Sequence, residues 1–257
     1  MTLPAPRVLL VEDDPVSRAF LTAAVQAVPA DVDSADNLAA ALALAQAHDY
    51  ALWLFDAHLA DGSGAELLHQ LRRSHPHIPA LAHTASVDAD VLDTLIAAGF
   101  LEVLIKPLPA AAIQGVVRRV LGLACEQGSS ATDIRLACPA AGKQPVWDDE
   151  AAALALNGNR AHIVTLRGLF VDELPRLRER IGVAVHGGDL DGVRGSLHKL
   201  RASCGFVGAA RLGEAARALH QQADSPALLA RFDEAAADTL DTAAATVGID
   251  QPAPSSG

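Results

Sequence analysis

The first half of the chain alternates short apolar runs with amphipathic segments, and this rhythm restricts the folds open to it. The apolar runs are Val8–Val11, Ala30–Val32, Leu52–Phe55, Ala80–Ala82 and Val103–Ile105. Segments with helical periodicity follow them, near residues 15–27, 37–47, 64–73, 88–98 and 109–121. Strands that are apolar throughout are buried on both faces of a sheet. The pattern predicts an α/β domain with a doubly wound, five-stranded parallel sheet.

After residue 121 no strand pattern remains, and residues 128–132 and 139–142 have the small and polar composition of a linker. From Trp147 onward the periodicity is helical. It predicts a short helix near 148–156, a long one containing Pro175, a third that begins after Asp189, a fourth near 209–222 and a last one from Pro226 to about 247. Short connections between such helices favour an antiparallel four-helix bundle.

These observations divide the chain into 1–124 for the α/β domain, 125–145 for a linker, 146–248 for the helical bundle and 249–257 for a disordered tail.

The net charge of −11 argues against binding to nucleic acid or to anionic membranes. No segment approaches the roughly 18 uninterrupted apolar residues of a membrane span. Acidic residues come too early for a signal peptide, so we expect a cytoplasmic protein. Met1 lies close to the first expected strand, which favours a protein that stands alone over the end of a longer chain.

Polar side chains gather at the predicted strand ends, where parallel sheets of this kind bind ligands. They are Glu12, Asp13 and Asp14 after the first strand, Asp56 after the third, Thr84 after the fourth and Lys106 after the fifth. Clustered carboxylates repel one another unless a cation joins them, and their hard oxygens suit Mg²⁺. A hydroxyl and an ammonium beside the metal would complete a cradle for a phosphoryl group, with a carboxylate as nucleophile.

Residues 7–121 resemble a response-regulator receiver domain, which has a flavodoxin-like fold. The resemblance lies in Val8-Leu9-Leu10-Val11-Glu12-Asp13-Asp14-Pro15, Leu54-Phe55-Asp56, Thr84-Ala85 and Lys106-Pro107. Thr84 and Lys106 match the switch hydroxyl and the lysine of that family. The chain departs from the family at Ala60, where proline is usual, and at Val103, where an aromatic switch residue is usual.

The resemblance implies Mg²⁺-dependent transfer from a phosphohistidine of a sensor histidine kinase onto Asp56. Glu12 and Asp13 would take the metal-site places together with Asp56, and His58 would offer its backbone carbonyl to the metal. A haloacid-dehalogenase-like phosphatase would instead need a second aspartate two residues after the nucleophile, where this chain has His58.

One of the ten histidines stands out in the second half. His198 lies beside the apolar stripe Leu190, Val193, Leu197, Leu200 and Cys204, on a row with Arg194 and Arg201. These cations disfavour a protonated imidazole and would stabilise an attached phosphoryl group. The string from His198 to Ala209 resembles the histidine-phosphotransfer motif, with Arg201 for the more usual lysine and Ala202 for the usual glycine. It implies that His198 is a second phospho-acceptor.

The other histidines receive no site assignment. His83 abuts Thr84, and we expect its side chain to point to the opposite face; His220 shows no convergent partner in the sequence.

The chain contains no glycine-rich nucleotide loop and no second histidine motif of a kinase. We therefore expect a non-enzymatic phosphorelay intermediate: Asp56 accepts from a kinase, and His198 exchanges phosphoryl with Asp56 or with a separate receiver. The alternative is a phosphorylation-switched binding module in which His198 is a phosphate sink or idle.

Overall fold

The computed structural model describes residues 5–123 and 144–247. The linker predicted at 125–145 lies almost wholly, and the tail predicted at 249–257 wholly, outside these residues. The chain forms two compact units: the first contains the elements from β1 to α5, and the second contains most of α6 and all of α7 to α10. Among the described residues no helix is long and apolar enough to cross a membrane.

The first unit is built on a parallel sheet with the strand order β2-β1-β3-β6-β7. Its strands are β1 Arg7–Val11, β2 Asp31–Ala35, β3 Leu52–Asp56, β6 Ala80–Thr84 and β7 Glu102–Ile105. The five expected strands and the doubly wound fold are thus confirmed. The sequence did not predict a hairpin of two-residue strands, β4 His58–Leu59 and β5 Gly62–Ser63, which follows directly after Asp56.

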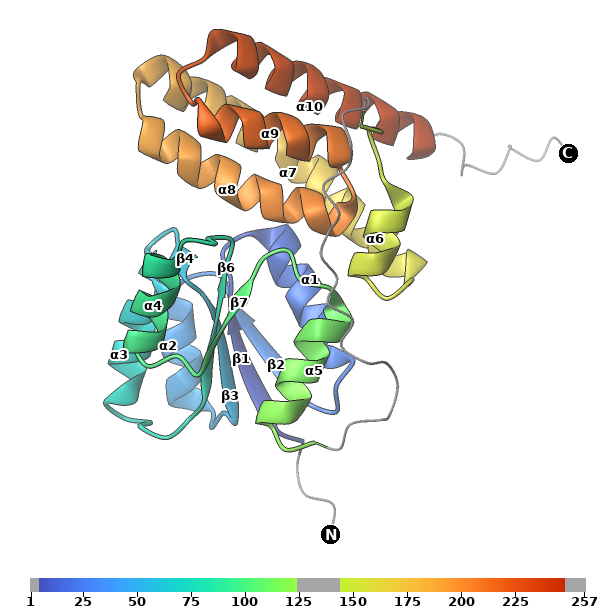
Figure 1. The fold of residues 1–257 in the computed structure, drawn as a ribbon. Coiled ribbons are helices and arrows are strands. Elements are labelled where there is room, and N and C mark those ends of the chain that lie inside the picture. The colour runs from blue at the N-terminus through green and yellow to red at the C-terminus, as the bar shows by residue number, and fades with distance from the viewer. Residues whose placement is uncertain (1–4, 124–143, 248–257) are drawn as a thin grey trace, which may run out of the picture. The chain divides into compact units, whose positions relative to one another are not determined.

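Helices cover both faces of this sheet, α1 and α5 on one face and α2, α3 and α4 on the other (Figure 1). They are α1 Pro15–Gln26, α2 Leu38–Ala47, α3 Gly64–Arg72, α4 Ala89–Ala97 and α5 Ala110–Val120. Local capping explains why α1 begins directly beside the acidic motif: the side chain of Asp14 accepts a 2.7 Å hydrogen bond from the amide of Ser17, and Pro15 opens the helix.

The second unit consists of α6 Asp149–Ala155, α7 Arg160–Gly187, α8 Leu190–Val207, α9 Ala210–Gln221 and α10 Pro226–Val247. Helix α7 packs against α8 and α10, and α9 packs against the same two helices, which closes the expected antiparallel four-helix bundle (Figure 1). Asp189 caps α8 as predicted, because its side chain accepts a 2.9 Å hydrogen bond from the amide of Gly192. Pro175 lies inside α7, which continues on both sides of it.

The segment before α6 is fastened to the turn between α8 and α9. The amide of Asp148 donates a 2.6 Å hydrogen bond to the carbonyl of Gly208, whose φ of 73° lies in the left-handed region. Arg167 adds a second tie, because it lies 4.7 Å over the ring of Trp147 and donates a 2.9 Å hydrogen bond to the carbonyl of Val207. A Cβ atom at Gly208 would overlap the carbonyl oxygen of Asp148.

We expect Gly208→Ala to destabilise the second unit by about 3 kcal/mol, from left-handed strain and the clash with Asp148 together. Gly188→Ala is the matched control, because Gly188 also has a φ of 73° but nothing within 4 Å of its Cβ position. It should cost only the strain, about 1 kcal/mol. Urea unfolding of the full chain, followed by circular dichroism, measures both, and equal losses would show that the Asp148 contact is not tight.

Candidate functional site

The predicted acidic site lies at the carboxyl ends of four parallel strands. Glu12 and Asp13 directly follow β1, and Asp56 is the last residue of β3. Thr84 ends β6, and Lys106 directly follows β7. Glu12, Asp56, Thr84 and Lys106 are all buried. The fold therefore brings together side chains that are up to 94 residues apart in the chain.

Lys106 holds two of these carboxylates at once. Its Nζ donates a 2.6 Å hydrogen bond to Glu12 Oε2 and a 2.7 Å hydrogen bond to Asp56 Oδ2. The side chains are 4% exposed for Lys106, 1% for Glu12 and 6% for Asp56, so water screens these ion pairs little. One ammonium thus joins the ends of β1 and β3 from the end of β7.

The same edge has the composition of a divalent cation site. Carboxylate oxygens of Glu12, Asp13 and Asp56 all lie within 4.8 Å of one another. Glu12 Oε1 is buried and has no hydrogen-bond partner within the described part of the chain, so it is left for a ligand. The amide of His58 donates a 3.0 Å hydrogen bond to Asp56 Oδ1, which orients that carboxylate. Three hard oxygen donors fit Mg²⁺.

Backbone hydrogen bonds hold the site residues in the sheet. The amide of Lys106 donates to the carbonyl of Thr84 at 2.6 Å, and the amide of Ala57 donates to the carbonyl of His83 at 3.0 Å. Gly64 packs so closely that a Cβ atom there would overlap the carbonyl oxygen of Asp56. The strand pairing therefore continues up to the residues of the candidate site.

Burial and charge act on the two ends of the ion pair differently. Burial raises the pKa of Asp56, and although Lys106 opposes this, nearby Glu12 raises it further. Burial alone would lower the pKa of Lys106, but Glu12 and Asp56 outweigh it and the pKa is raised. Lys106 is thus firmly protonated, whereas Asp56 is a carboxylate that a cation would help to ionise.

His83 corrects one expectation. His83 and Thr84 point to opposite faces of the sheet, as expected. The face to which His83 points, however, also carries the side chains of Asp56 and Lys106, so His83 lies at the site. His83 and Asp56 are register partners in neighbouring strands, and His83 Nδ1 lies 3.8 Å from Glu12 Oε2. The alternation of side chains was correct, and the inference that it removes His83 from the site was wrong.

The predicted histidine site of the bundle lies on α8. Val193, Leu197, Leu200 and Cys204 are buried as the stripe predicted, and His198 beside them is half-buried. Sequence analysis was wrong about His220 on α9, because the packing of α8 on α9 places its ring 6.3 Å from that of His198, centroid to centroid. Burial, Arg201 and Arg194 lower the pKa of His220.

Arg217 on α9 is a third arginine close to this histidine pair, beside Arg194 and Arg201. The pKa of Arg201 is lowered first by burial and then by the positive charge of Arg217. Arg217 and His220 are three residues apart, on one face of α9. Only the contact between α8 and α9 relates them to His198, and helical periodicity within α9 does not reveal that contact.

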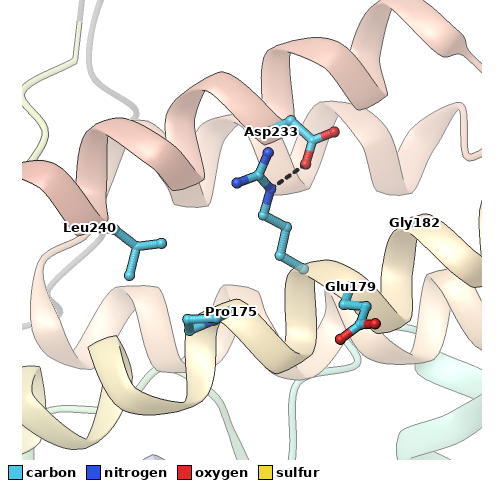
Figure 2. A pocket seen from close by; sticks show the side chains of 6 residues that line it. Pro175, Glu179, Gly182, Asp233 and Leu240 are labelled. Atoms are coloured by element: carbon cyan, nitrogen blue, oxygen red, sulfur yellow. Dashed lines mark hydrogen bonds and ion pairs between the residues drawn. The ribbon is translucent and has the colours of Figure 1, made fainter.

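A pocket of about 380 Å³ between α7 and α10 lies elsewhere in the bundle (Figure 2). Pro175, Arg178, Glu179, Gly182, Asp233 and Leu240 line it. An ion pair with a 2.6 Å distance from Arg178 Nε to Asp233 Oδ1 spans it, as the dashed line in Figure 2 marks. None of the predicted site residues is among its lining residues.

Comparisons with known families match both units. Residues 8–118 match the response regulator receiver domain, and residues 165–246 match the Hpt domain. The signal transduction histidine-protein kinase BarA of Shigella flexneri is 25% identical over 246 residues, which are 88% of this chain and 26% of that protein. The sensor histidine kinase AruS of Pseudomonas aeruginosa is 30% identical over 220 residues, 84% of this chain and 21% of that protein. The chain thus spans about a quarter of the length of these relatives or less.

Solved structures resemble the first unit. The chemotaxis response regulator CheY4 of Vibrio cholerae is 23% identical, with a TM-score of 0.43, and the match covers 45% of this chain and 98% of that one. The receiver domain of a putative LuxO repressor protein from Vibrio parahaemolyticus is 26% identical, with a TM-score of 0.44 and coverages of 46% and 91%. Both family models are matched in order along the sequence, so the chain consists of a response regulator receiver domain followed by an Hpt domain, the combination of modules used in two-component phosphorelays.

Proposed function

We propose that the chain is a phosphorelay intermediate in which Asp56 and His198 are the two phospho-acceptors. The observation that carries the proposal is the buried carboxylate of Asp56, held by Lys106 and within 4.8 Å of oxygens from Glu12 and Asp13. A nucleophile in such surroundings can meet a dianionic phosphoryl group only if cations neutralise the charge. Lys106 supplies one positive charge, and the three carboxylates attract another.

At Asp56 the reaction is the displacement of an imidazole. The P–N bond of a donor phosphohistidine breaks as a P–O bond to Asp56 forms, and the released nitrogen takes up a proton. Glu12, Asp13 and Asp56 would hold Mg²⁺, with the backbone carbonyl of His58 as a further ligand. The bound cation supplies charge neutralisation at the phosphoryl oxygens. Lys106 and the hydroxyl of Thr84 would donate to the same oxygens.

At His198 the charges come from guanidinium groups. Arg194 and Arg201 on α8 both lower the pKa of His220. The ring of His220 lies 6.3 Å from that of His198, so these two charges also act beside His198. A phosphoryl group that leaves an aspartate for His198 would gain charge-assisted hydrogen bonds from these arginines. This favours a working relay over an idle histidine.

A sensor histidine kinase is the proposed donor to Asp56. The partner of His198 is either Asp56 or a separate receiver, and both routes use the same chemistry. The relatives that are named as histidine kinases support a kinase partner. The receiver and Hpt modules are phosphoryl carriers, and we propose no ATP-dependent activity for the chain.

Asp56→Asn should abolish labelling of the receiver domain by radioactive acetyl phosphate with Mg²⁺, because the amide is no nucleophile. Wild type should acquire base-labile phosphate, and Asp61→Asn, which changes an exposed carboxylate that caps α2, serves as the matched control. Scintillation counting after gel filtration measures the label. Equal labelling of wild type and Asp56→Asn would refute Asp56 as the acceptor.

Lys106→Met should destabilise the receiver domain by about 3–5 kcal/mol, because two buried carboxylates lose their shared cation. Mg²⁺ should raise the melting temperature of this variant more than that of wild type, since the metal replaces the missing charge. The exposed pair of Arg119 and Glu102 supplies the control: Arg119→Met should cost under about 1 kcal/mol and leave the Mg²⁺ response unchanged. Calorimetry with and without Mg²⁺ tests this. A Mg²⁺ response no larger than that of wild type would contradict a shared cation site.

His198 is tested by mixing two complementary variants. His198→Gln is charged with acetyl phosphate on Asp56, freed of donor and added to Asp56→Asn, which keeps His198. Base-stable, acid-labile label should appear on the acceptor chain, and it should not appear if the acceptor also carries His198→Gln. His186→Gln is the control, because His186 is exposed and its Nδ1 lies 2.6 Å from the carbonyl oxygen of Gly182 on the same helix, α7.

The rate in wild type then separates the two routes. Transfer within one chain gives a rate constant independent of protein concentration, whereas transfer between chains gives a rate that rises with it. Base-stable label on the acceptor that carries both Asp56→Asn and His198→Gln would show that another residue is phosphorylated.

A further inference from the structure

The most unusual group of the receiver domain is His83, because it is polar, wholly buried and unsatisfied. It is the penultimate residue of β6, directly before Thr84, and is 0% exposed. Neither ring nitrogen has a hydrogen-bond partner among the described residues. Burial and the charge of Lys106 lower its pKa, so the imidazole is neutral. A buried polar group without partners destabilises the fold, and an apolar residue of similar size would avoid this loss.

The position of His83 relates it to Glu12 rather than to a metal. The carboxylates of Glu12, Asp13 and Asp56 form the group that can share one cation, and His83 is not among the residues whose ligand atoms converge there. His83 Nδ1 instead lies 3.8 Å from Glu12 Oε2, just beyond hydrogen-bond distance. That oxygen now accepts from Lys106 at 2.6 Å.

Phosphorylation of Asp56 would upset this arrangement. Lys106 Nζ is already 2.7 Å from Asp56 Oδ2, so a dianionic phosphoryl group on Asp56 would attract the ammonium strongly. Glu12 Oε2 would then lose its donor inside a site where the Glu12 side chain is 1% exposed and water cannot replace it. His83 is a nearby group that could donate to this oxygen, because its Nδ1 lies 3.8 Å away.

We propose that His83 is a positioning residue that takes over Glu12 Oε2 as a hydrogen-bond donor through Nδ1 when Lys106 turns to the phosphoryl group. A small rotation of the ring closes the 3.8 Å gap. Glu12 then keeps its place and its charge in the phosphorylated state. In the resting state the unsatisfied ring of His83 lowers the stability of the domain, and in the phosphorylated state the ring has a hydrogen-bond partner. The inference rests on the proposed function of Asp56.

The test compares the resting protein with the protein bound to beryllofluoride, a phosphoryl mimic that attaches to a carboxylate. His83→Leu should raise the melting temperature of the free full-length chain by roughly 3 °C, because it removes unsatisfied polar atoms. The same variant should bind beryllofluoride and Mg²⁺ about tenfold more weakly, because Glu12 loses its replacement donor. Fluorine NMR titration measures the binding. His83→Asn, whose amide nitrogen reaches the place of Nδ1, should restore binding to within about twofold.

Trp53→Phe is the matched control. It removes another buried N–H without a partner among the described residues, but Trp53 belongs to the hydrophobic cluster on the other face of the sheet. Its beryllofluoride affinity should equal that of wild type. Unchanged binding by His83→Leu would overturn the inference. Weak binding by His83→Leu and His83→Asn alike, with a lowered melting temperature in both, would overturn it too and make His83 a packing residue.

The two hypotheses fail in different ways. If wild type does not bind beryllofluoride, or if Asp56→Asn binds it equally well, the proposed function of Asp56 is wrong and the role of His83 falls with it. If wild type binds, Asp56→Asn does not, and His83→Leu matches wild type, only the inference about His83 is wrong.

Discussion

The receiver domain depends on one ammonium group that is shared between two buried carboxylates. Lys106 reaches from the end of β7 to Glu12 after β1 and to Asp56 on β3, and so neutralises an acidic edge that would otherwise repel itself. The parallel order of the sheet makes this possible, because strands far apart in the chain end side by side. An anion that binds at Asp56 would attract the Lys106 ammonium, and so would compete with Glu12 for it.

The two proposed phospho-acceptors would solve the same electrostatic problem in opposite ways. Asp56 is buried among carboxylates, and its phosphorylation would depend on Lys106 and on an added cation. His198 is half-buried on the same helix as Arg194 and Arg201. A histidine acceptor carries no charge of its own when neutral, so arginines alone suffice beside it. An aspartate acceptor brings a negative charge and needs the cation as well.

The sequence predicted the sheet, its helices and the strand-end residues well, because strand ends and helix stripes are local features with a fixed geometry. Glu12, Asp56 and Lys106 each follow or end an apolar run, so their convergence follows from the parallel fold. His83 was missed although alternation placed it correctly, because the face opposite Thr84 was not recognised as that of Asp56. His220 could not be found from the sequence, since its approach to His198 depends on how α8 and α9 pack. The hairpin β4–β5 has strands too short to leave a periodic signal.

The hydrogen bonds from Lys106 to Thr84 and from Ala57 to His83 extend the ladder of the sheet into the site itself. Backbone groups in such a ladder open only when a large part of the domain unfolds, which is rare and slow. Rearrangements of side chains within a packed interior are far faster and need no strand to separate. If phosphorylation of Asp56 starts a signal, as proposed, that signal has to leave the site through side chains and the loops beyond the strand ends, while the sheet stays rigid.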